Sequence, residues 1–297
     1  MSTHDEAPTR CIICNYTGPT TSAGFLQLYA QHEKPPVPVA WWECPNCGSW
    51  FGSPHPTIEE IRCNWAQTFY NDPKIEAKYA EFKIESQNRI LDAIEAVRPE
   101  KGTVLDYGSN FGHFLEMARD RGWTAIGSDA FDEGVKASRE KGFETHLAWS
   151  LEDLTIPDGS LDALVSNDVF YYVWEPYKHL EKVFALLKPG GVFVMRTSNK
   201  LTVERTLRRV IPTGEKRNTL FSRLLQAQFH SIQANTITKV MTQIGFNVKS
   251  AAGAMTAPNE EYSKKTVVLY KTADFLYWLT GGGVNLSPGI MIVAVKR

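Results

Sequence analysis

The sequence lacks three features that would point to a secreted, membrane-bound or nucleic-acid-bound protein. No apolar run approaches the length that crosses a bilayer. The first ten residues, MSTHDEAPTR, are polar and acidic, which predicts neither a secretory signal nor an arginine-rich transit peptide. The formal net charge of -1 gives no overall field toward nucleic acid or an anionic membrane. We therefore expect a soluble cytoplasmic protein without a membrane span, and nucleic acid is not the favoured partner.

Cysteine is absent from the chain after Cys63. The five cysteines all lie in the first quarter, and four of them form two C-x-x-C pairs: Cys11, Cys14, Cys44 and Cys47. Such pairs can present four thiolates to a tetrahedral zinc ion, and a site filled by four protein ligands is structural. Redox pairs or disulfides are the alternative, but the sequence shows no export signal. We predict a structural Zn²⁺ ion, with Cys63 outside the site.

The chain divides into three predicted parts. Residues 1–70 form a small zinc-ribbon module, in which the tryptophans and phenylalanine around the second cysteine pair pack the ribbon. Residues 71–100 repeat apolar positions at a helical period and predict a linking helix. From residue 101 to 297, apolar strand candidates alternate with helical segments, which predicts an α/β domain around a mostly parallel sheet. A substrate-binding insertion is expected near residues 200–235.

A glycine-bearing turn opens this domain, in the stretch VLDYGSNFGHF. Gly108 and Gly112 allow a tight strand-to-helix turn with close backbone approach to a ligand. Asp129, which ends the second strand candidate about twenty residues later, is placed to accept hydrogen bonds from a ribose. Asp106 ends the first strand and could fix the loop or receive a cation. By themselves these features fit a dinucleotide as well as other adenosine cofactors.

Four stretches in order, LDYGSNFG, AIGSD, LEDLTIPDGSLDALVSNDVF and LLKPGGVFVMRTSN, resemble the class I S-adenosylmethionine-dependent methyltransferases. The core is similar to that of the ubiquinone O-methyltransferases. The third glycine of a dinucleotide motif is missing, and Asn110 replaces the second. The resemblance implies a Rossmann-like sheet of seven strands with the last one antiparallel, and S-adenosylmethionine as cofactor. It assigns these residues to the cofactor: Asp106, Gly108, Ser109, Asn110, Phe111, Gly112, Asp129, Ala130, Ser150, Leu151 and Asn167.

The sequence departs from this family after the fourth strand. Many relatives have Glu-His-Val where this chain has Tyr171, Tyr172 and Val173, so the usual histidine is missing. His230 lies where related enzymes have a histidine in the insertion. We therefore expect His230, Tyr171 and Tyr172 to deprotonate or position the methyl acceptor, and a histidine on a helix surface is the alternative. An unperturbed tyrosine is a poor base at neutral pH.

One basic stretch follows the fifth strand, between residues 199 and 223. It contains Arg205, Arg208, Arg209, Lys216, Arg217 and Arg223 against two glutamates. This excess predicts a phosphate-bearing or acidic acceptor, unless the stretch is a solvated helix face. The segment KTADFLYWLTGGGVN is expected to cover the acceptor pocket with aromatic side chains.

Taken together, these features predict O-methylation of a saccharide, lipid-linked or secondary-metabolite acceptor, that is, a small molecule or glycan. Three alternatives stay open. The chain could be a zinc-module rRNA or tRNA base methyltransferase, a relative of the sugar C-methyltransferases, or a protein that binds cofactor or a partner without catalysis. The altered glycine loop and the missing histidine favour the last of these.

Overall fold

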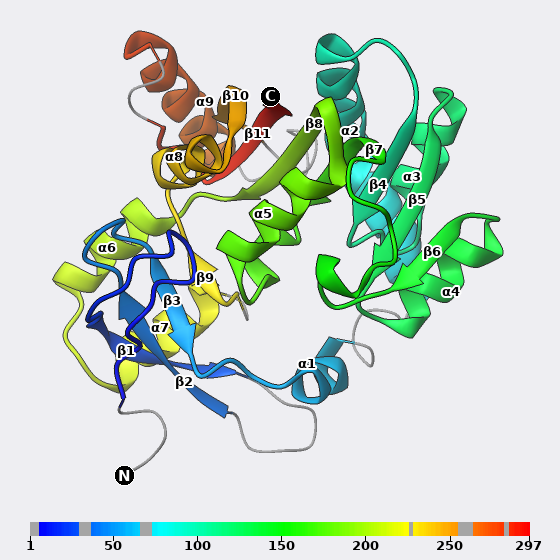
Figure 1. Ribbon diagram of the computed structural model, residues 1–297. Coiled ribbons are helices and arrows are strands. Elements are labelled where there is room, and N and C mark those ends of the chain that lie inside the picture. Colours follow the sequence, from blue (N-terminus) through cyan, green and yellow to red (C-terminus); the bar gives the residue numbers. More distant parts are fainter. Residues whose placement is uncertain (1–5, 30–36, 66–72, 226–227, 255–263, 282–284) are drawn as a thin grey trace.

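The computed structural model describes residues 6–29, 37–65, 73–225, 228–254, 264–281 and 285–297. Two sheets organise this part of the chain, a large one of seven strands and a smaller one of four (Figure 1). The smaller sheet contains the first three strands of the chain and lies below the large sheet in the view of Figure 1. Among the described residues, no helix is long and apolar enough to cross a membrane.

The large sheet has the order β10-β11-β8-β7-β4-β5-β6. Only β11 runs antiparallel to its neighbours, so the predicted mostly parallel, seven-stranded sheet with an antiparallel last strand is confirmed. Central strands β4 and β7 are buried on both faces, as parallel strands are when helices cover both sides of a sheet. The bounds are β4 Thr103–Tyr107, β5 Thr124–Asp129, β6 Glu144–Leu147, β7 Leu161–Asn167, β8 Leu187–Ser198, β10 Phe246–Gly253 and β11 Gly289–Lys296.

Helices cover the two faces of this sheet. On one face, Ile90 and Leu91 of α2 and Leu115 of α3 join a core cluster with Val104 of β4. On the other, α5 and α8 pack in a second cluster that includes Leu105, the next residue of β4. The predicted linking helix is α2, which ends one residue before Arg98. The bounds are α2 Pro73–Val97, α3 His113–Asp120, α4 Asp132–Glu140, α5 Pro176–Leu186, α8 Ala234–Ile244 and α9 Lys264–Leu279.

The smaller sheet is antiparallel, with the order β1-β2-β3-β9. Its first three strands are β1 Thr21–Tyr29, β2 Val37–Glu43 and β3 Trp50–Ser53, and α1 Ile58–Trp65 follows. The fourth strand, β9 His230–Ser231, comes from the predicted insertion, about 180 positions further along the chain. The ribbon sheet is therefore completed by a segment that the sequence assigned to the substrate-binding insertion.

Two helices of the insertion, α6 Leu201–Val210 and α7 Glu215–Leu225, pack against this ribbon sheet. The rings of Phe25 and Phe221 stack with centroids 4.3 Å apart, and Trp50 meets Phe221 edge to face. Side chains of Asn218 and Ser222 accept hydrogen bonds from the backbone of β1, which satisfies donors on an edge strand. The prediction that the aromatics pack the ribbon is confirmed. Trp41 and Trp50 join the cluster that includes α7, whereas Trp42 and Phe51 join the cluster that includes α5 and α8.

Candidate functional site

A cavity of about 210 Å³ opens where strands β4, β5 and β7 end. In an open parallel sheet, ligands bind outside the carboxyl ends of the strands, so this is the expected place for a cofactor. Residues from the large sheet, from α1 and α2 and from the insertion meet there. The lining consists of Ile61, Lys83, Tyr107, Gly108, Asn110, Asp129, Ala130, Phe131, Trp149, Asn167, Asp168, Val169, Tyr171, Tyr172 and Phe229.

The turn between β4 and α3 forms one wall of the cavity. Gly108 has φ 84°, which side chains rarely adopt, and a Cβ there would lie 3.0 Å from Val169 Cγ2, so a larger residue would be strained and crowded. Asn110 also adopts a left-handed conformation, with φ 50°, which asparagine tolerates better than most residues. The sequence departure from the family loop is thus accommodated by the conformation expected for asparagine.

Asp129 ties this turn to the end of β5. Its Oδ2 accepts a hydrogen bond from the backbone N–H of Asn110 at 2.8 Å, and its Oδ1 accepts one from Phe131 at 3.0 Å. Asp106 lies behind it, buried and outside the cavity lining. Burial and the charge of Asp129 raise the pKa of Asp106 to about 8. Asp129 is therefore the carboxylate presented to the cavity, and Asp106 is predominantly protonated at pH 7.

Two buried amide oxygens belong to the same cavity lining as Asp129. Oδ1 of Asn110 and Oδ1 of Asn167 have no hydrogen-bond partner among the described residues, and both asparagines line the cavity. A buried polar atom without a partner costs about 1–3 kcal/mol. A bound ligand that donates hydrogen bonds would remove that cost, so the amides mark where polar groups of a ligand belong.

Ala130 lines the cavity, as predicted, but five other predicted cofactor residues do not. Ser109, Phe111 and Gly112 belong to the turn but are packed behind it. Ser150 accepts a hydrogen bond from the backbone of Glu152 and caps the short helix η2 Leu151–Asp153, and Leu151 is fully buried. Trp149, one residue earlier, contributes the side chain at this point, and its carbonyl accepts a hydrogen bond from the Tyr107 hydroxyl at 2.7 Å.

A charged group that the sequence did not reveal forms another wall. Asp168, with φ 61°, follows Asn167 at the end of β7 and pairs with both Lys83 of α2 and Arg196 of β8. Lys83 and Asp168 both line the cavity. Burial opposes ionisation of Asp168, but the two cations hold its pKa below the usual range. The network of Lys83, Asp168 and Arg196 therefore places charged groups at the cavity wall, although little of their side-chain surface is exposed.

The remaining wall is aromatic. Tyr171 and Tyr172 lie on the short helix η3 Phe170–Tyr172, and their rings meet edge to face at 4.6 Å. Phe229, Phe131 and Trp149 complete the surface. Burial raises the pKa of Tyr172 above its normal value, so this phenol stays protonated at neutral pH. Both tyrosines lie where the sequence placed them, at the cavity.

His230 does not reach the cavity. It lies in β9, about 1 % exposed, and its Nε2–H donates to the Phe170 carbonyl at 3.0 Å. Burial lowers the pKa of His230 to about 3, so the ring is neutral at pH 7. The position is neither a helix surface nor a contact with the lining, and it does not support the predicted catalytic role. The ring instead holds the segment that bears the two tyrosines.

The basic stretch, which was predicted to bind an acidic acceptor, instead makes contacts within the protein. Arg205 and Arg208 both pair with Glu43 of the ribbon, and Arg208 lies over the ring of Trp50. Arg217 donates to backbone carbonyls of Ile211 and Gly24. None of the six cations lines the cavity, and neither do the described residues of α9, where the aromatic cover was expected. Arg205, Arg208 and Arg217 attach the insertion to the ribbon rather than bind an acceptor in the cavity.

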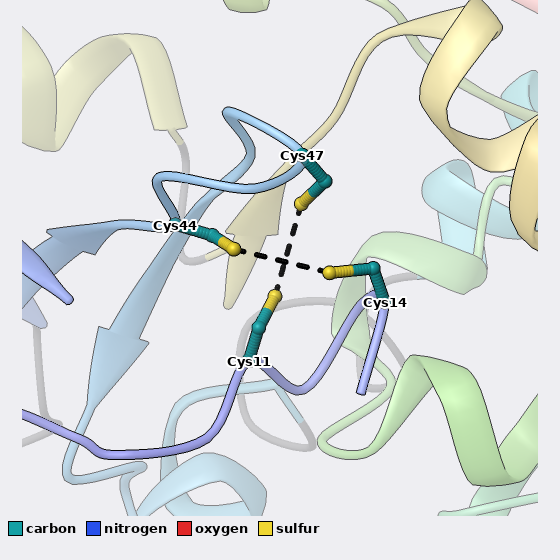
Figure 2. A group of neighbouring side chains, drawn as sticks. All are labelled: Cys11, Cys14, Cys44 and Cys47. Atoms are coloured by element: carbon teal, nitrogen blue, oxygen red, sulfur yellow. Dashed lines mark hydrogen bonds between the residues drawn. The ribbon is translucent and has the colours of Figure 1, made fainter. Parts of the chain in front are cut away.

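The four predicted cysteine ligands converge on one point at the junction of the ribbon with the large domain. Figure 2 shows the thiols of the two pairs directed toward a common centre. The four sulfurs lie within 4.8 Å of one another, and the Cys11–Cys47 and Cys14–Cys44 pairs are each 3.8 Å apart. Sulfurs on a tetrahedral zinc ion with bonds of about 2.3 Å are about 3.8 Å apart. The side chain of Cys63 lies outside the described residues.

A sequence model of the methyltransferase domain family matches residues 79–251, more than half of the chain. The "Probable S-adenosylmethionine-dependent methyltransferase" of Mycolicibacterium smegmatis is 26% identical over 153 residues, which cover 50% of this chain and 54% of that protein. The ubiquinone biosynthesis O-methyltransferase of Paramagnetospirillum magneticum is 32% identical over 109 residues, with 35% and 44% covered. The chain thus spans about half the length of these curated relatives.

Solved structures show the same fold at low identity. An S-adenosylmethionine-dependent methyltransferase from Archaeoglobus fulgidus superposes with a TM-score of 0.50 at 19% identity, covering 75% of this chain and 98% of that one. Phosphoethanolamine N-methyltransferase 2 from Haemonchus contortus gives 0.54 at 14% identity, covering 84% and 62%. The matched residues 79–251 include the glycine turn, Asp129 and the ends of β4, β5 and β7, and on this ground the chain belongs to the methyltransferase domain family.

Proposed function

We propose that the protein is an S-adenosylmethionine-dependent methyltransferase that O-methylates a saccharide, lipid-linked or secondary-metabolite acceptor. The observation that supports it most directly is the cavity at the ends of β4, β5 and β7, with Asp129 beside two unpartnered amide oxygens. The small-molecule acceptor and the cytoplasmic location remain predictions from the sequence. The basic stretch no longer argues for a phosphate-bearing acceptor, because three of its arginines bind the protein itself.

The lining fits this cofactor chemically. S-adenosylmethionine has ribose hydroxyls and an ammonium group that donate hydrogen bonds, a carboxylate that accepts them, and an apolar adenine face. Asp129 would hold the ribose, and the amide oxygens of Asn110 and Asn167 would receive donors from the methionine end. The Lys83 ammonium places positive charge in the same cavity for the carboxylate. Trp149 and Phe131 offer aromatic surface for adenine.

When bound, the cofactor supplies a methyl group made electrophilic by the attached sulfonium. The chain's own contribution is to align the acceptor with it and exclude water. Tyr171 and Tyr172 would position an acceptor hydroxyl by hydrogen bonding, since burial keeps Tyr172 protonated. The aromatic wall suits either the apolar face of a sugar ring or an apolar acceptor. His230 is not part of this proposal.

The cysteine cluster is proposed to hold a structural zinc ion. Four thiolates at tetrahedral spacing leave no open position for substrate. Metal analysis of the purified protein should find one zinc per chain, and Cys44→Ser should lower that ratio. A protein that folds and binds no zinc would remove the proposal.

Calorimetric titration with S-adenosylmethionine, its demethylated product and NADH tests the cofactor assignment. Asp129→Ala removes the carboxylate from the cavity. Losing hydrogen bonds to a charged acceptor costs about 1.5–3 kcal/mol, so the dissociation constant should rise about 10- to 150-fold. Asp158→Ala, at a surface site 63 % exposed, is the matched control and should bind as the wild type does. Binding of NADH alone would overturn the assignment.

A further inference from the structure

We infer that the cysteine-bearing ribbon builds the acceptor side of the cavity, so that zinc occupancy governs acceptor binding and leaves cofactor binding intact. In this arrangement Ile61 and Phe229 are specificity-determining residues for the acceptor. The inference rests on the proposed function and extends it. It follows from how each wall of the cavity is attached to the rest of the molecule.

Phe229 is held in the cavity by the ribbon sheet. Its carbonyl accepts a hydrogen bond from the Gly52 N–H of β3 at 2.9 Å, and the next residue, His230, pairs with Phe51. Its own N–H donates to the Tyr171 carbonyl, also at 2.9 Å. Phe229 therefore joins the ribbon to the tyrosine-bearing segment through its backbone, while its ring faces the cavity.

The first cysteine pair holds the other flank of the tyrosine-bearing segment. The carbonyl of Ile12, between Cys11 and Cys14, accepts a hydrogen bond from the Tyr177 N–H at 3.0 Å. The Arg10 guanidinium binds both carboxylate oxygens of Glu175, at 2.7 and 2.5 Å. These contacts fix the start of α5, which begins four residues after Tyr172. A displaced cysteine loop would therefore release the aromatic wall.

The second cysteine pair fixes the chain that follows β9. The carbonyl of Cys47 accepts a hydrogen bond from the Thr236 hydroxyl at 3.2 Å. The Arg205 guanidinium donates to the carbonyl of the next residue, Gly48, and pairs with Glu43. The two cysteine pairs thus hold opposite flanks of the acceptor wall, which consists of Tyr171, Tyr172 and Phe229. A metal ion bound by both pairs would hold both flanks at once.

The cofactor turn has hydrogen bonds of its own. Gly108 and Ser109 donate to the Ser128 carbonyl, and Asn110 donates to Asp129, all within the large sheet and its turns. Apolar packing also connects this side to the ribbon, since Tyr107 shares a core cluster with Cys11 and Phe131 packs against the ribbon's own cluster. Because Phe229 and the start of α5 are hydrogen-bonded to the ribbon, whereas the turn is hydrogen-bonded within the large sheet, zinc removal should loosen the acceptor side first.

Hydrogen exchange read by mass spectrometry tests this separation on the full-length protein, with and without zinc removed by 1,10-phenanthroline. Zinc removal should speed exchange at least 10-fold at residues 170–177 and 228–236, which lie far from the cysteines in sequence. Residues 104–131 should keep their rate, and the dissociation constant of S-adenosylmethionine should change less than about 3-fold. Equal acceleration on both sides, or no change at 170–177, would overturn the inference.

Two variants keep the test decisive if metal-free protein unfolds. Arg10→Ala removes the contact with Glu175 without touching a cysteine, and should speed exchange at 170–177 with zinc content unchanged. Lys182→Ala is the control. Lys182 lies on α5 and pairs with Asp158, which precedes β7, so its loss should leave exchange at 170–177 unchanged. Equal exchange in the two variants would refute the role of the cysteine loop.

The outcomes separate this inference from the function on which it rests. A protein that binds S-adenosylmethionine but no zinc would overturn the inference and leave the cofactor assignment standing. A protein that binds zinc but not S-adenosylmethionine would overturn both, since the inference requires an intact cofactor side. Phe229→Ala in the zinc-bound protein should leave the cofactor dissociation constant within about 3-fold of wild type, and a larger loss would place Phe229 on the cofactor side.

Discussion

Replacing Asp168 by asparagine should destabilise the protein strongly. The change keeps the side chain's shape but leaves the ammonium of Lys83 and the guanidinium of Arg196 without their shared counter-charge. Both cations are about 5 % exposed, so they have little access to water in place of the carboxylate. Removing one partner of a buried ion pair typically costs about 3–5 kcal/mol, which for a chain of this size lowers Tm by about 5–15 °C.

The assay is thermal unfolding without cofactor, followed by circular dichroism. Asp158→Asn is the matched control, since Asp158 pairs with Lys182 at 2.8 Å on the surface. An exposed pair contributes about 1 kcal/mol or less, so the control should move Tm by no more than about 3 °C. A shift for Asp168→Asn no larger than the control would refute the reasoning about the buried network.

The dependence on pH gives a second check. The folded-state pKa of Asp168 is depressed, so its stabilisation is full above the unfolded-state pKa of about 3.9 and is lost as the pH falls toward the folded value. The difference in Tm between wild type and Asp168→Asn should therefore be greatest above about pH 5 and shrink in acid. A difference that grows below pH 4 would contradict the assigned charge state.

Other measurements test the buried groups around the site. The folded-state pKa of Asp106 is raised to about 8, so the free energy of unfolding of the wild type should fall as the pH rises from about 4 to 8. In Asp106→Asn this loss is absent, so the variant should become more stable than the wild type by on the order of 1 kcal/mol per pH unit in that range. The Tm curves of the two proteins should therefore diverge. The pKa of His230 is lowered to about 3, so the wild type should lose stability below about pH 6.5 while His230→Gln loses less, and cofactor titration should give both the same affinity. Parallel Tm curves would contradict the first expectation, and a much weaker cofactor affinity for His230→Gln the second.

The sequence predicted the parts of the site whose geometry is set locally. The glycine turn and Asp129 lie within one strand-turn-helix unit and the strand beside it, so the spacing of a few residues determines where they meet. The two C-x-x-C pairs could also be predicted from the sequence, because each is a short loop that presents two thiols to one point. Helical and strand periodicity predicted the alternation of strands and helices for the same reason, whereas the seven-stranded sheet with an antiparallel last strand came from the family resemblance.

Side chains that depend on distant partners were not predictable in this way. Lys83 lies in the linking helix and meets Asp168, 85 positions later, only after the sheet is assembled. His230 was matched to a histidine of relatives by its position in the insertion, but its pairing with β3 turns it away from the cavity. The cluster of arginines predicted an anion, and the chain itself supplies that anion as Glu43. Composition reveals an unbalanced charge but not where its partner lies.

Strand β9 has a consequence for the order in which the molecule assembles. Its two residues pair with β3 across about 180 positions of chain, although β1, β2 and β3 are neighbours in sequence. During synthesis the ribbon must therefore wait with one strand edge open until β4 to β8 of the large sheet have been made. The ribbon strands precede β4 to β8 in the sequence but are completed after them, and the pairing with β9 closes a long loop whose formation is intrinsically slow.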